Sequence, residues 1–140
     1  MARGVTLVEL LIVVSIIALL ASTALVMFNI QTIKGRDAKR KADLAQIRVK
    51  IEDYYNDKNM YPTHSGDFKM NACGAAGATT CMWGDAWAVG TGASAQTYMG
   101  ILPKDPKNER SYRYLQFGSN HYAISACLEN KDDESCNSIS

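Results

Sequence analysis

The stretch GVTLVELLIVVSIIALLASTALVMFNIQTI, residues 4–33, decides the fold of this chain. Between Leu10 and Ile33 it holds 24 residues with no charged side chain and no Gly or Pro. An α-helix needs about 20 predominantly apolar residues to cross the hydrocarbon core of a bilayer. The segment is therefore predicted to be a helix that spans a membrane or is buried on all sides by equivalent helices.

One acidic residue, Glu9, lies inside the apolar run, because it follows Val5-Thr6-Leu7-Val8. A charged side chain costs at least ~2.5 kcal/mol at the centre of a bilayer and less near its edge, so it normally has a partner. The neighbouring sequence offers no such partner. A cationic group from another chain is the natural candidate.

Residues 4–11, Gly-Val-Thr-Leu-Val-Glu-Leu-Leu, resemble the prepilin motif of type IV pilins and type II secretion pseudopilins. That motif is a short basic leader ending in Gly, then a hydrophobic residue, then Thr-Leu-aliphatic-Glu at the start of a long apolar helix. The resemblance implies that prepilin peptidase cleaves after Gly4 and methylates the new amine of Val5. It also implies that Glu9 neutralises the Val5 amine of a neighbouring subunit.

Two other interpretations of the apolar segment stay open. A conventional secretory signal has an apolar stretch of about 7–15 residues and a small-residue cleavage site. Residues 22–24, Ser-Thr-Ala, could serve as that site, but Glu9 and the continuation through Met27-Phe28 count against it. A plain membrane anchor accounts for the length but leaves Glu9 unexplained.

The four cysteines fall into two close pairs, Cys73 with Cys81 and Cys127 with Cys136. Neither pair has the tight spacing of a zinc site, and both histidines lie far from a ligand pattern. We predict disulfides 73–81 and 127–136, one of the three pairings that four cysteines allow, because each closes a short local loop. Disulfides imply an oxidising exterior, and four free buried thiols are the alternative.

After the apolar run the pattern stays helical until Tyr61-Pro62, where proline ends the ladder. The apolar positions Leu44, Ile47, Ile51, Tyr54 and Tyr55 have the spacing of one helix face. One helix is therefore predicted from about residue 5 to about residue 59, with a hydrophobic part at 5–33 and an amphipathic part within 34–61.

Residues 34–50 carry seven basic and two acidic side chains. Such a cluster could bind nucleic acid or lipid headgroups. Acidic residues are interleaved and no aromatic platform accompanies the cluster, so nucleic acid is not indicated. A solvated helix face, or one that pairs with acidic residues of the next subunit in a filament, is favoured.

By the positive-inside tendency the cluster would place the C-terminal part in the cytoplasm. The disulfides and the resemblance place it outside, and we follow them.

Residues 62–140 are predicted to form the globular head. Residues 62–100 show little periodicity, and we expect a variable loop that Trp83 and Trp87 anchor to the helix rather than a ligand site. Residues 111–117 and 121–128 alternate as two strands, and Gly118-Ser119-Asn120 joins them as a hairpin. Together with the resemblance, this predicts an α+β pilin fold: a long N-terminal helix packed on a small antiparallel sheet of three to four strands.

No catalytic constellation, phosphate-binding loop or nucleophile motif appears in the sequence, so we expect no enzyme and no cofactor. Residues 132–134 lack the ligand spacing of an EF-hand, so no metal is expected either.

The expected function is a structural subunit of a type IV pilus-like extracellular filament, with residues 1–4 as leader. Before assembly the precursor would cross the cytoplasmic membrane once, with its C-terminal part outside. Expected partners are identical or homologous pilin subunits, prepilin peptidase and an inner-membrane assembly platform. A secretion pseudopilin, or a membrane-anchored binding module that does not polymerise, are the alternatives.

Overall fold

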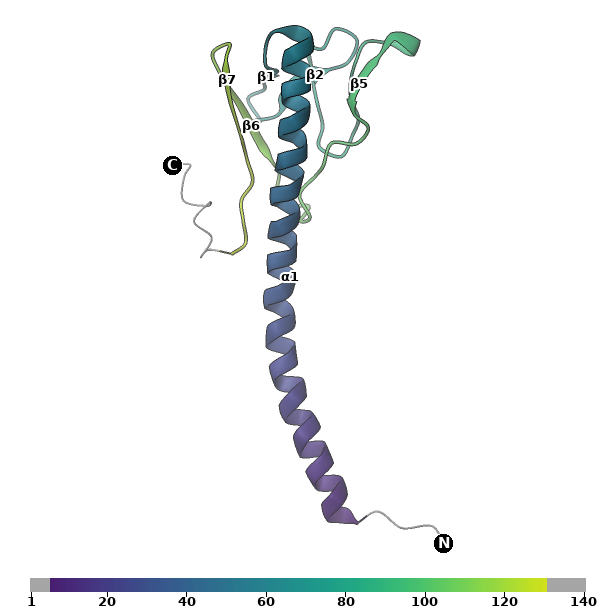
Figure 1. Cartoon of the computed structure of the whole chain (residues 1–140), viewed down its shortest axis with the longest axis vertical. Coiled ribbons are helices and arrows are strands. Elements are labelled where there is room, and N and C mark those ends of the chain that lie inside the picture. Colours follow the sequence, from purple (N-terminus) through teal and green to yellow (C-terminus); the bar gives the residue numbers. More distant parts are fainter. Residues whose placement is uncertain (1–5, 131–140) are drawn as a thin grey trace. The chain divides into compact units, whose positions relative to one another are not determined.

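The computed structural model describes residues 6–130, apart from the side chain of Val26 (Figure 1). Within these residues one α-helix, α1, runs from Leu7 to Lys58, and short strands follow it. The strands are β1 Thr63–His64, β2 Met70–Cys73, β3 Thr79–Thr80, β4 Trp87–Val89, β5 Gln96–Met99, β6 Arg113–Phe117 and β7 His121–Ser125, with a 3₁₀ turn, η1, at Gly92–Ser94. The α+β class is confirmed. The chain divides into two compact units, one up to Gly35 and the second, called the head below, from Arg36 onward.

The end of α1 follows from local chemistry. Asn59 has a positive φ of 54°, and its N–H bonds to the carbonyl of Tyr55 at 2.8 Å. A left-handed residue at this place is a common helix terminator, and Asn tolerates it better than most residues. Lys58 in the last turn complements the negative end of the helix dipole. The helix therefore ends where the sequence predicted.

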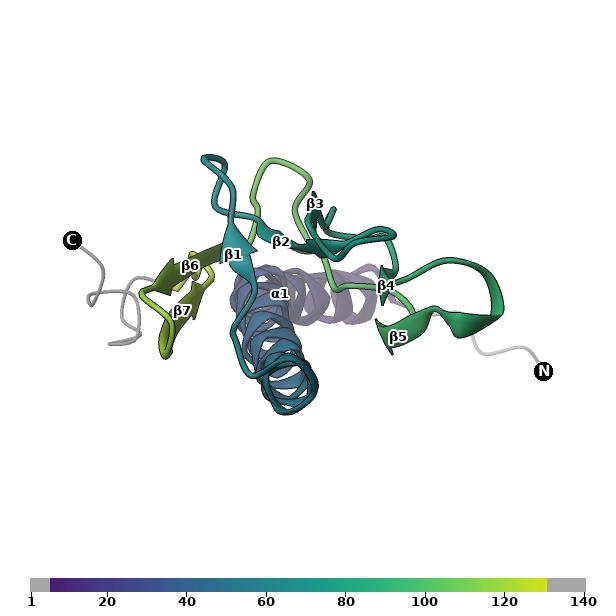
Figure 2. The same ribbon diagram turned by 90° about the horizontal axis from the view of Figure 1, so that it is seen from above.

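The strands form three small antiparallel sheets in the order β1-β2-β3, β4-β5 and β6-β7. The predicted hairpin is present as β6-β7, paired from Arg113 opposite Ser125 to Phe117 opposite His121. Gly118 turns it with a φ of 64°. Seen along the helix, β6-β7 and β4-β5 lie on opposite sides of α1 (Figure 2).

The segment 62–100 differs from the expectation, because it contains β1 to β5 rather than one irregular loop. These strands have two to four residues each, and β2 is buried along most of its length instead of alternating. The N–H groups of Gly74 and Gly90 bond to the carbonyls of Ala88 and Gly74, both at 3.1 Å, and tie β2 to β4. The single sheet of three to four strands is therefore replaced by three sheets of two or three strands.

The core of the head packs against the predicted apolar stripe of α1. Ile47 and Ile51 are fully buried, and Tyr54 is nearly so. Against them pack Met70, Ala72, Cys73, Cys81, Trp87, Tyr98, Leu102, Tyr112 and Tyr114. Trp87 is also fully buried, and its Nε1 donates to the carbonyl of Ala72 at 3.0 Å. Burial of each large apolar side chain contributes about 1.5–3 kcal/mol, so Trp87 serves to anchor the segment to the helix.

A disulfide joins Cys73 and Cys81, whose Cα atoms lie 5.2 Å apart. It closes the turn between β2 and β3. Cys127 is exposed, and its predicted partner, Cys136, lies outside the described residues. The bridge 127–136 therefore stays a prediction.

Peptide mapping without reduction should recover one linked peptide pair for 73–81 and one for 127–136. Loops this short suggest roughly 2–3 kcal/mol of stabilisation per bridge on chain-entropy grounds. Reduction should accordingly lower the unfolding temperature of the purified chain. A 73–127 link, or free thiols at all four positions, would contradict the pairing.

Candidate functional site

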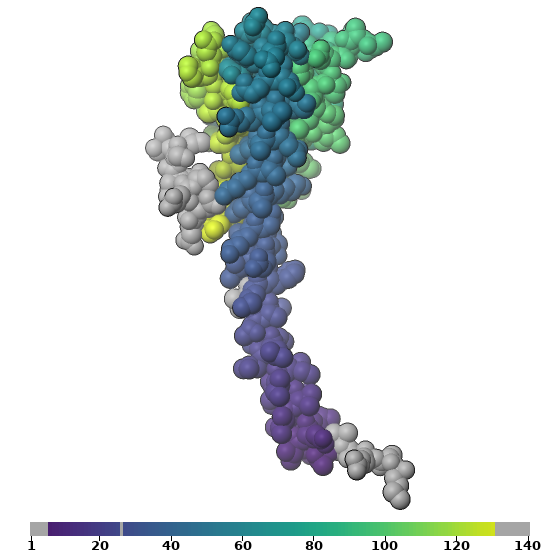
Figure 3. All heavy atoms as spheres, in the orientation of Figure 1, coloured from purple at the N-terminus to yellow at the C-terminus, as the bar shows by residue number. Residues whose placement is uncertain are grey.

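The described part of the first unit exposes a largely apolar helix surface. Between Leu7 and Phe28 the large hydrophobic side chains are mostly exposed, for example Leu7 at 81%, Leu25 at 70% and Phe28 at 72%. Figure 3 shows the atoms of this segment in purple to blue. Soluble monomers rarely expose an apolar patch larger than a few hundred Å². By length and composition α1 can cross a membrane, although a secretory signal would pass the same test. Lipid or other apolar helices would remove this surface from water.

The hydroxyl groups on this helix do not interrupt its apolar character. Ser15 Oγ donates to the carbonyl of Leu11 at 2.7 Å, and Thr32 Oγ1 donates to that of Phe28 at 2.9 Å. Ser22 and Thr23 bond in the same way to Leu19 and Leu20, at 2.8 and 2.9 Å. A buried polar group is costly only when it lacks a hydrogen bond. The segment can therefore leave water without stranding these hydroxyls.

Glu9 lies in the first turn of α1, and Thr6 immediately precedes the helix. The N–H of Glu9 bonds to Thr6 Oγ1 at 3.3 Å, and the N–H of Thr6 bonds to Glu9 Oε2 at 3.4 Å. This reciprocal pattern is a capping box, whose signature is Ser or Thr followed three residues later by Glu or Gln. Thr6-Leu7-Val8-Glu9 carries that signature, so a local partner of Glu9 was visible in the sequence and was missed.

The capping interaction is weak and leaves Glu9 available. N–H···O bonds are usually 2.7–3.2 Å long, so distances of 3.3 and 3.4 Å indicate little energy. A carboxylate can accept about four hydrogen bonds. Glu9 is exposed and sits where the helix dipole favours a negative charge. It can therefore still accept a cation from another chain.

A family model described as the prokaryotic N-terminal methylation motif matches residues 1–25. The chain carries the prepilin-like signal of type IV pilins and pseudopilins. This signal marks a substrate of prepilin peptidase and belongs to structural, non-enzymatic proteins. It fits a membrane-anchored precursor that goes on to pilus-type assembly. No curated protein and no solved structure matches the chain.

The prepilin-like signal contains three of the predicted site residues. Glu9 is described above, whereas Gly4 and Val5, at the expected cleavage point, lie outside the described residues. The signal also includes the first half of the exposed apolar helix. Cleavage at Gly4 and methylation of Val5 therefore stay proposals.

Behind the prepilin-like signal, the head holds a buried ionic network centred on Arg40, whose side chain is fully buried. Its guanidinium donates to both carboxylate oxygens of Asp105, from Nε at 2.7 Å and from Nη2 at 2.8 Å. Its Nη1 donates to Asp37 at 2.6 Å and to Glu129 at 2.9 Å. Bidentate, charge-assisted bonds of this kind are among the strongest in proteins.

The same network holds the segment after β7 against α1. Arg36 makes a bidentate pair with Glu129 at 2.6 and 2.7 Å. The backbone N–H groups of Glu129 and Asn130 donate to the Asp37 carboxylate, each at 2.9 Å. Arg36 and Arg40 are thus paired within their own chain. The expectation of a basic face that is solvated, or that pairs with the next subunit, is wrong for these two arginines.

The carboxylates of the network stay ionised. Burial alone would raise the pKa of Asp37, but the N–H groups of Glu129 and Asn130 and the Arg40 guanidinium lower it. Burial alone would likewise raise the pKa of Asp105. The hydrogen bonds from Arg40 and from the N–H of Lys107 outweigh this effect, so the pKa of Asp105 is lowered. The hydrogen bonds from Arg36 lower the pKa of Glu129. These pKa values are lower in the folded chain than in the unfolded chain, where they lie near 4. The network therefore stabilises the head fully at pH values above about 4. This stabilisation is lost as the pH falls through the pKa values of the folded chain.

Proposed function

We propose that this chain is a structural subunit of a type IV pilus-like extracellular filament. Prepilin peptidase would remove residues 1–4, and subunits would then assemble through the apolar part of α1. The observation that carries the proposal is Glu9 within the methylation motif, at the start of an apolar helix that its own chain leaves uncovered. In this proposal residues 5–33 form the filament core, residues 34–61 the amphipathic half of the helix, and residues 62–140 the head.

The exposed helix supports a passage from bilayer to filament. Apolar surface leaves water favourably, by roughly 25 cal/mol for each Å². In the precursor the lipid covers this surface, and in the filament equivalent helices would cover it. The hydroxyls of Ser15 and Thr32 donate to backbone carbonyls of their own helix, so they need no further partner in either environment. The subunit can therefore change its apolar environment without exposing α1 to water.

Cleavage after Gly4 would also create a cationic partner for Glu9. The new α-amine of Val5 has an ordinary pKa near 8, so it is mostly cationic at pH 7. An opposite charge in apolar surroundings is what an acidic side chain near a membrane needs. The Val5 amine of a neighbour, rather than that of the same chain, would join two subunits.

The disulfide between Cys73 and Cys81 supports an exterior location of the head, since disulfides persist in oxidising compartments. The precursor would therefore cross the cytoplasmic membrane once, with its C-terminal part outside. An inner-membrane assembly platform would extract it into a filament of identical or homologous subunits.

The mature chain should begin at a methylated Val5. Intact-mass measurement of the purified protein should show the loss of residues 1–4 and the gain of one methyl group. The precursor expressed without prepilin peptidase is the control and should keep its full mass. An intact Met1 in cells with the peptidase, or a start near residues 23–25, would remove the prepilin interpretation.

A secretion pseudopilin is the second candidate, because the prepilin-like signal is common to both groups. It would share the processing but form a short filament instead of a surface pilus. Electron microscopy of sheared cell-surface fractions tests the proposal. Long filaments that contain this chain support a pilus subunit, and short filaments favour a pseudopilin. A processed chain that never polymerises would indicate a membrane-anchored binding module.

A further inference from the structure

The ionic network at the start of the head is neutral as a whole. It joins three cations to three anions, namely Arg36, Arg40 and Lys107 to Asp37, Asp105 and Glu129. These side chains satisfy one another within the chain and offer little net charge to an outside partner. Attraction of a charged partner to this part of the head therefore depends on other lysines.

Two lysines close to the network have no such partner. Lys39 and Lys104 are exposed, and neither forms an ion pair in the part of the chain that the structure describes. Together with Asp43 and Ile101 they line a cleft of about 340 Å³, which we call the basic cleft. Asp43 is only 8% exposed and accepts the Tyr112 hydroxyl at 2.7 Å. An outside molecule therefore meets the two ammonium groups before it meets the carboxylate.

The segment that carries Lys104 also exposes an apolar side chain. Ile101 is 71% exposed, although its neighbour Leu102 is fully buried. The N–H of Gly84 donates to the carbonyl of Leu102 at 2.8 Å, and the N–H of Leu102 donates to that of Asp85 at 2.7 Å, so the backbone is fixed here. The basic cleft thus presents two cations beside an apolar side chain. A lipid interface, with phosphate groups above acyl chains, matches both.

The chain places the basic cleft near the membrane. Lys39 follows Ile33, the last residue of the apolar run, by six residues, which is about 9 Å of helix. The run of 24 residues is about 36 Å long, and a bilayer is about 30 Å thick without and about 40–45 Å with its headgroups. With the run centred, the backbone of Lys39 lies roughly 5–7 Å outside the headgroups. A lysine side chain can extend that far to reach them.

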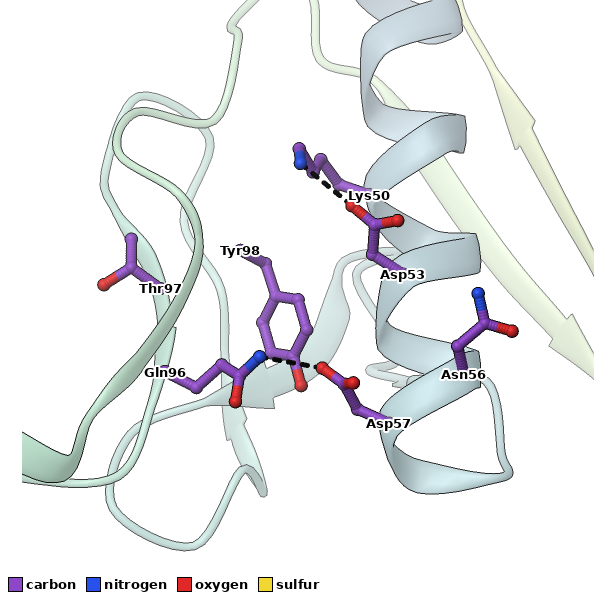
Figure 4. A pocket seen from close by; sticks show the side chains of 7 residues that line it. All are labelled: Lys50, Asp53, Asn56, Asp57, Gln96, Thr97 and Tyr98. Carbon is purple, nitrogen blue, oxygen red and sulfur yellow. Dashed lines mark hydrogen bonds and ion pairs between the residues drawn. The ribbon is translucent and has the colours of Figure 1, made fainter.

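A cleft of the same volume near the C-terminal end of α1 has the opposite character (Figure 4). Its lining carries two carboxylates and one ammonium. The ammonium of Lys50 pairs with Asp53 at 2.9 Å, and Asp57 accepts a bond from Gln96 Nε2 at 2.8 Å. Lys50 also follows Ile33 by 17 residues, about 25 Å of helix. Of these two clefts, the basic cleft is the one that combines positive charge with a position near the bilayer.

We propose that the basic cleft binds the phosphate groups of anionic phospholipids in the membrane that anchors the precursor. The phosphates accept hydrogen bonds from Lys39 and Lys104, and Ile101 enters the boundary between headgroups and acyl chains. This inference rests on the membrane-anchored precursor of the proposed function, and not on its polymerisation. The contact holds the head at the bilayer surface until the subunit is extracted.

Amine labelling of the full-length precursor, made without prepilin peptidase and reconstituted into vesicles, tests the contact. One set of vesicles is phosphatidylcholine, and in the other a third of the lipid is phosphatidylglycerol. A lysine at an anionic surface gains about fivefold in affinity, so Lys39 and Lys104 should label about threefold more slowly in the anionic vesicles. Lys50 is the internal control and should label equally in both. Salt at about 1 M, where the Debye length is about 3 Å, should abolish the difference. Inorganic phosphate added to phosphatidylcholine vesicles should not reproduce it.

Two variants divide the surface into its parts. Ile101→Ser removes the apolar contact and should weaken the protection of both lysines. Lys39→Gln removes one ammonium and should weaken the protection of Lys104. Because these side chains are exposed, the unfolding temperature of either variant in detergent should match that of the wild type. Lys50→Gln is the matched control and should leave the protection of Lys39 and Lys104 unchanged.

Equal labelling of Lys39 and Lys104 in the two kinds of vesicle, or equal slowing at Lys50, would overturn the lipid contact. Protection in sheared filaments but not in vesicles would assign the basic cleft to a neighbouring subunit and overturn it as well. A precursor that does not enter vesicles would remove both this contact and the proposed function. If the precursor shows the protection but the processed chain forms no filaments, the contact stands and the filament function fails.

Discussion

Arg40→Met should strongly destabilise the head. Arg40 is fully buried and joins Asp37, Asp105 and Glu129 in one network. Methionine fills a similar volume but leaves three carboxylates with fewer cations. Breaking a buried ion pair by removing one partner costs about 3–5 kcal/mol. Since a domain has a total stability of about 5–15 kcal/mol, this loss is a large fraction of the free energy of unfolding.

Thermal unfolding of the full chain in detergent, followed by circular dichroism of the head, measures this effect. For a domain of roughly 100 residues, 3–5 kcal/mol corresponds to a fall in Tm of more than about 10 °C. Lys50→Met is the matched control, because Lys50 and Asp53 form an i,i+3 pair as Arg40 and Asp37 do, but with side chains 39% and 47% exposed. Exposed pairs contribute about 0–1 kcal/mol. Equal Tm changes in the two variants would show that the Arg40 network adds no more than a surface pair.

Arg40→Lys distinguishes geometry from charge. Lysine keeps the positive charge but cannot make the bidentate bonds to Asp105 at 2.7 and 2.8 Å. We expect a Tm between those of the wild type and Arg40→Met. A Tm equal to that of the wild type would indicate that charge alone holds the network together.

Features of the fold with a local signal were predictable from the sequence. The apolar run, the stripe through Ile47 and Ile51, and the stop at Tyr61-Pro62 each depend on residues that are close in the chain. The β6-β7 hairpin likewise depends on alternation about a short turn. Strands β1 to β5 left no such signal, because two to four residues are too few to show a period of two. Their positions are set by contacts with one another, with β6 and with the core side chains of α1, and none of these contacts is encoded locally in the sequence.

The ionic network could not be predicted from the sequence either, because its partners are far apart along the chain. Arg40 is 65 residues from Asp105 and 89 from Glu129, and nothing near either acid identifies an arginine partner. The basic cluster was therefore interpreted as a surface, although Arg36 is partly buried and Arg40 is fully buried. The capping box of Glu9 is a different case, because Thr6 and Glu9 have the required spacing. The sequence interpretation considered only cationic partners for Glu9, whereas Thr6 is a neutral one.

Substitution of Glu9 should impair assembly while leaving the chain in the membrane. Removing the carboxylate makes residence in lipid easier, so insertion should be unaffected or improved. In the filament the same change would leave the Val5 amine of a neighbour buried without its counterion. That loss costs about 3–5 kcal/mol, which is more than a factor of 100 in an association constant. Glu9→Asp keeps the charge but shortens its reach, so a partial defect is expected.

The capping box allows the charge to be separated from the cap. Glutamine also serves in a capping box, so Glu9→Gln keeps the cap and loses only the charge. Thr6→Ala does the reverse at a cost of about 1 kcal/mol to the start of the helix. We expect Glu9→Gln and Glu9→Ala to reduce the filament yield similarly and Thr6→Ala to reduce it little, with processing checked by mass in every variant. If Glu9→Ala subunits form filaments at wild-type yield, Glu9 does not pair with the neighbouring amine. If only Glu9→Ala and Thr6→Ala are defective, the cap rather than the charge is what assembly requires.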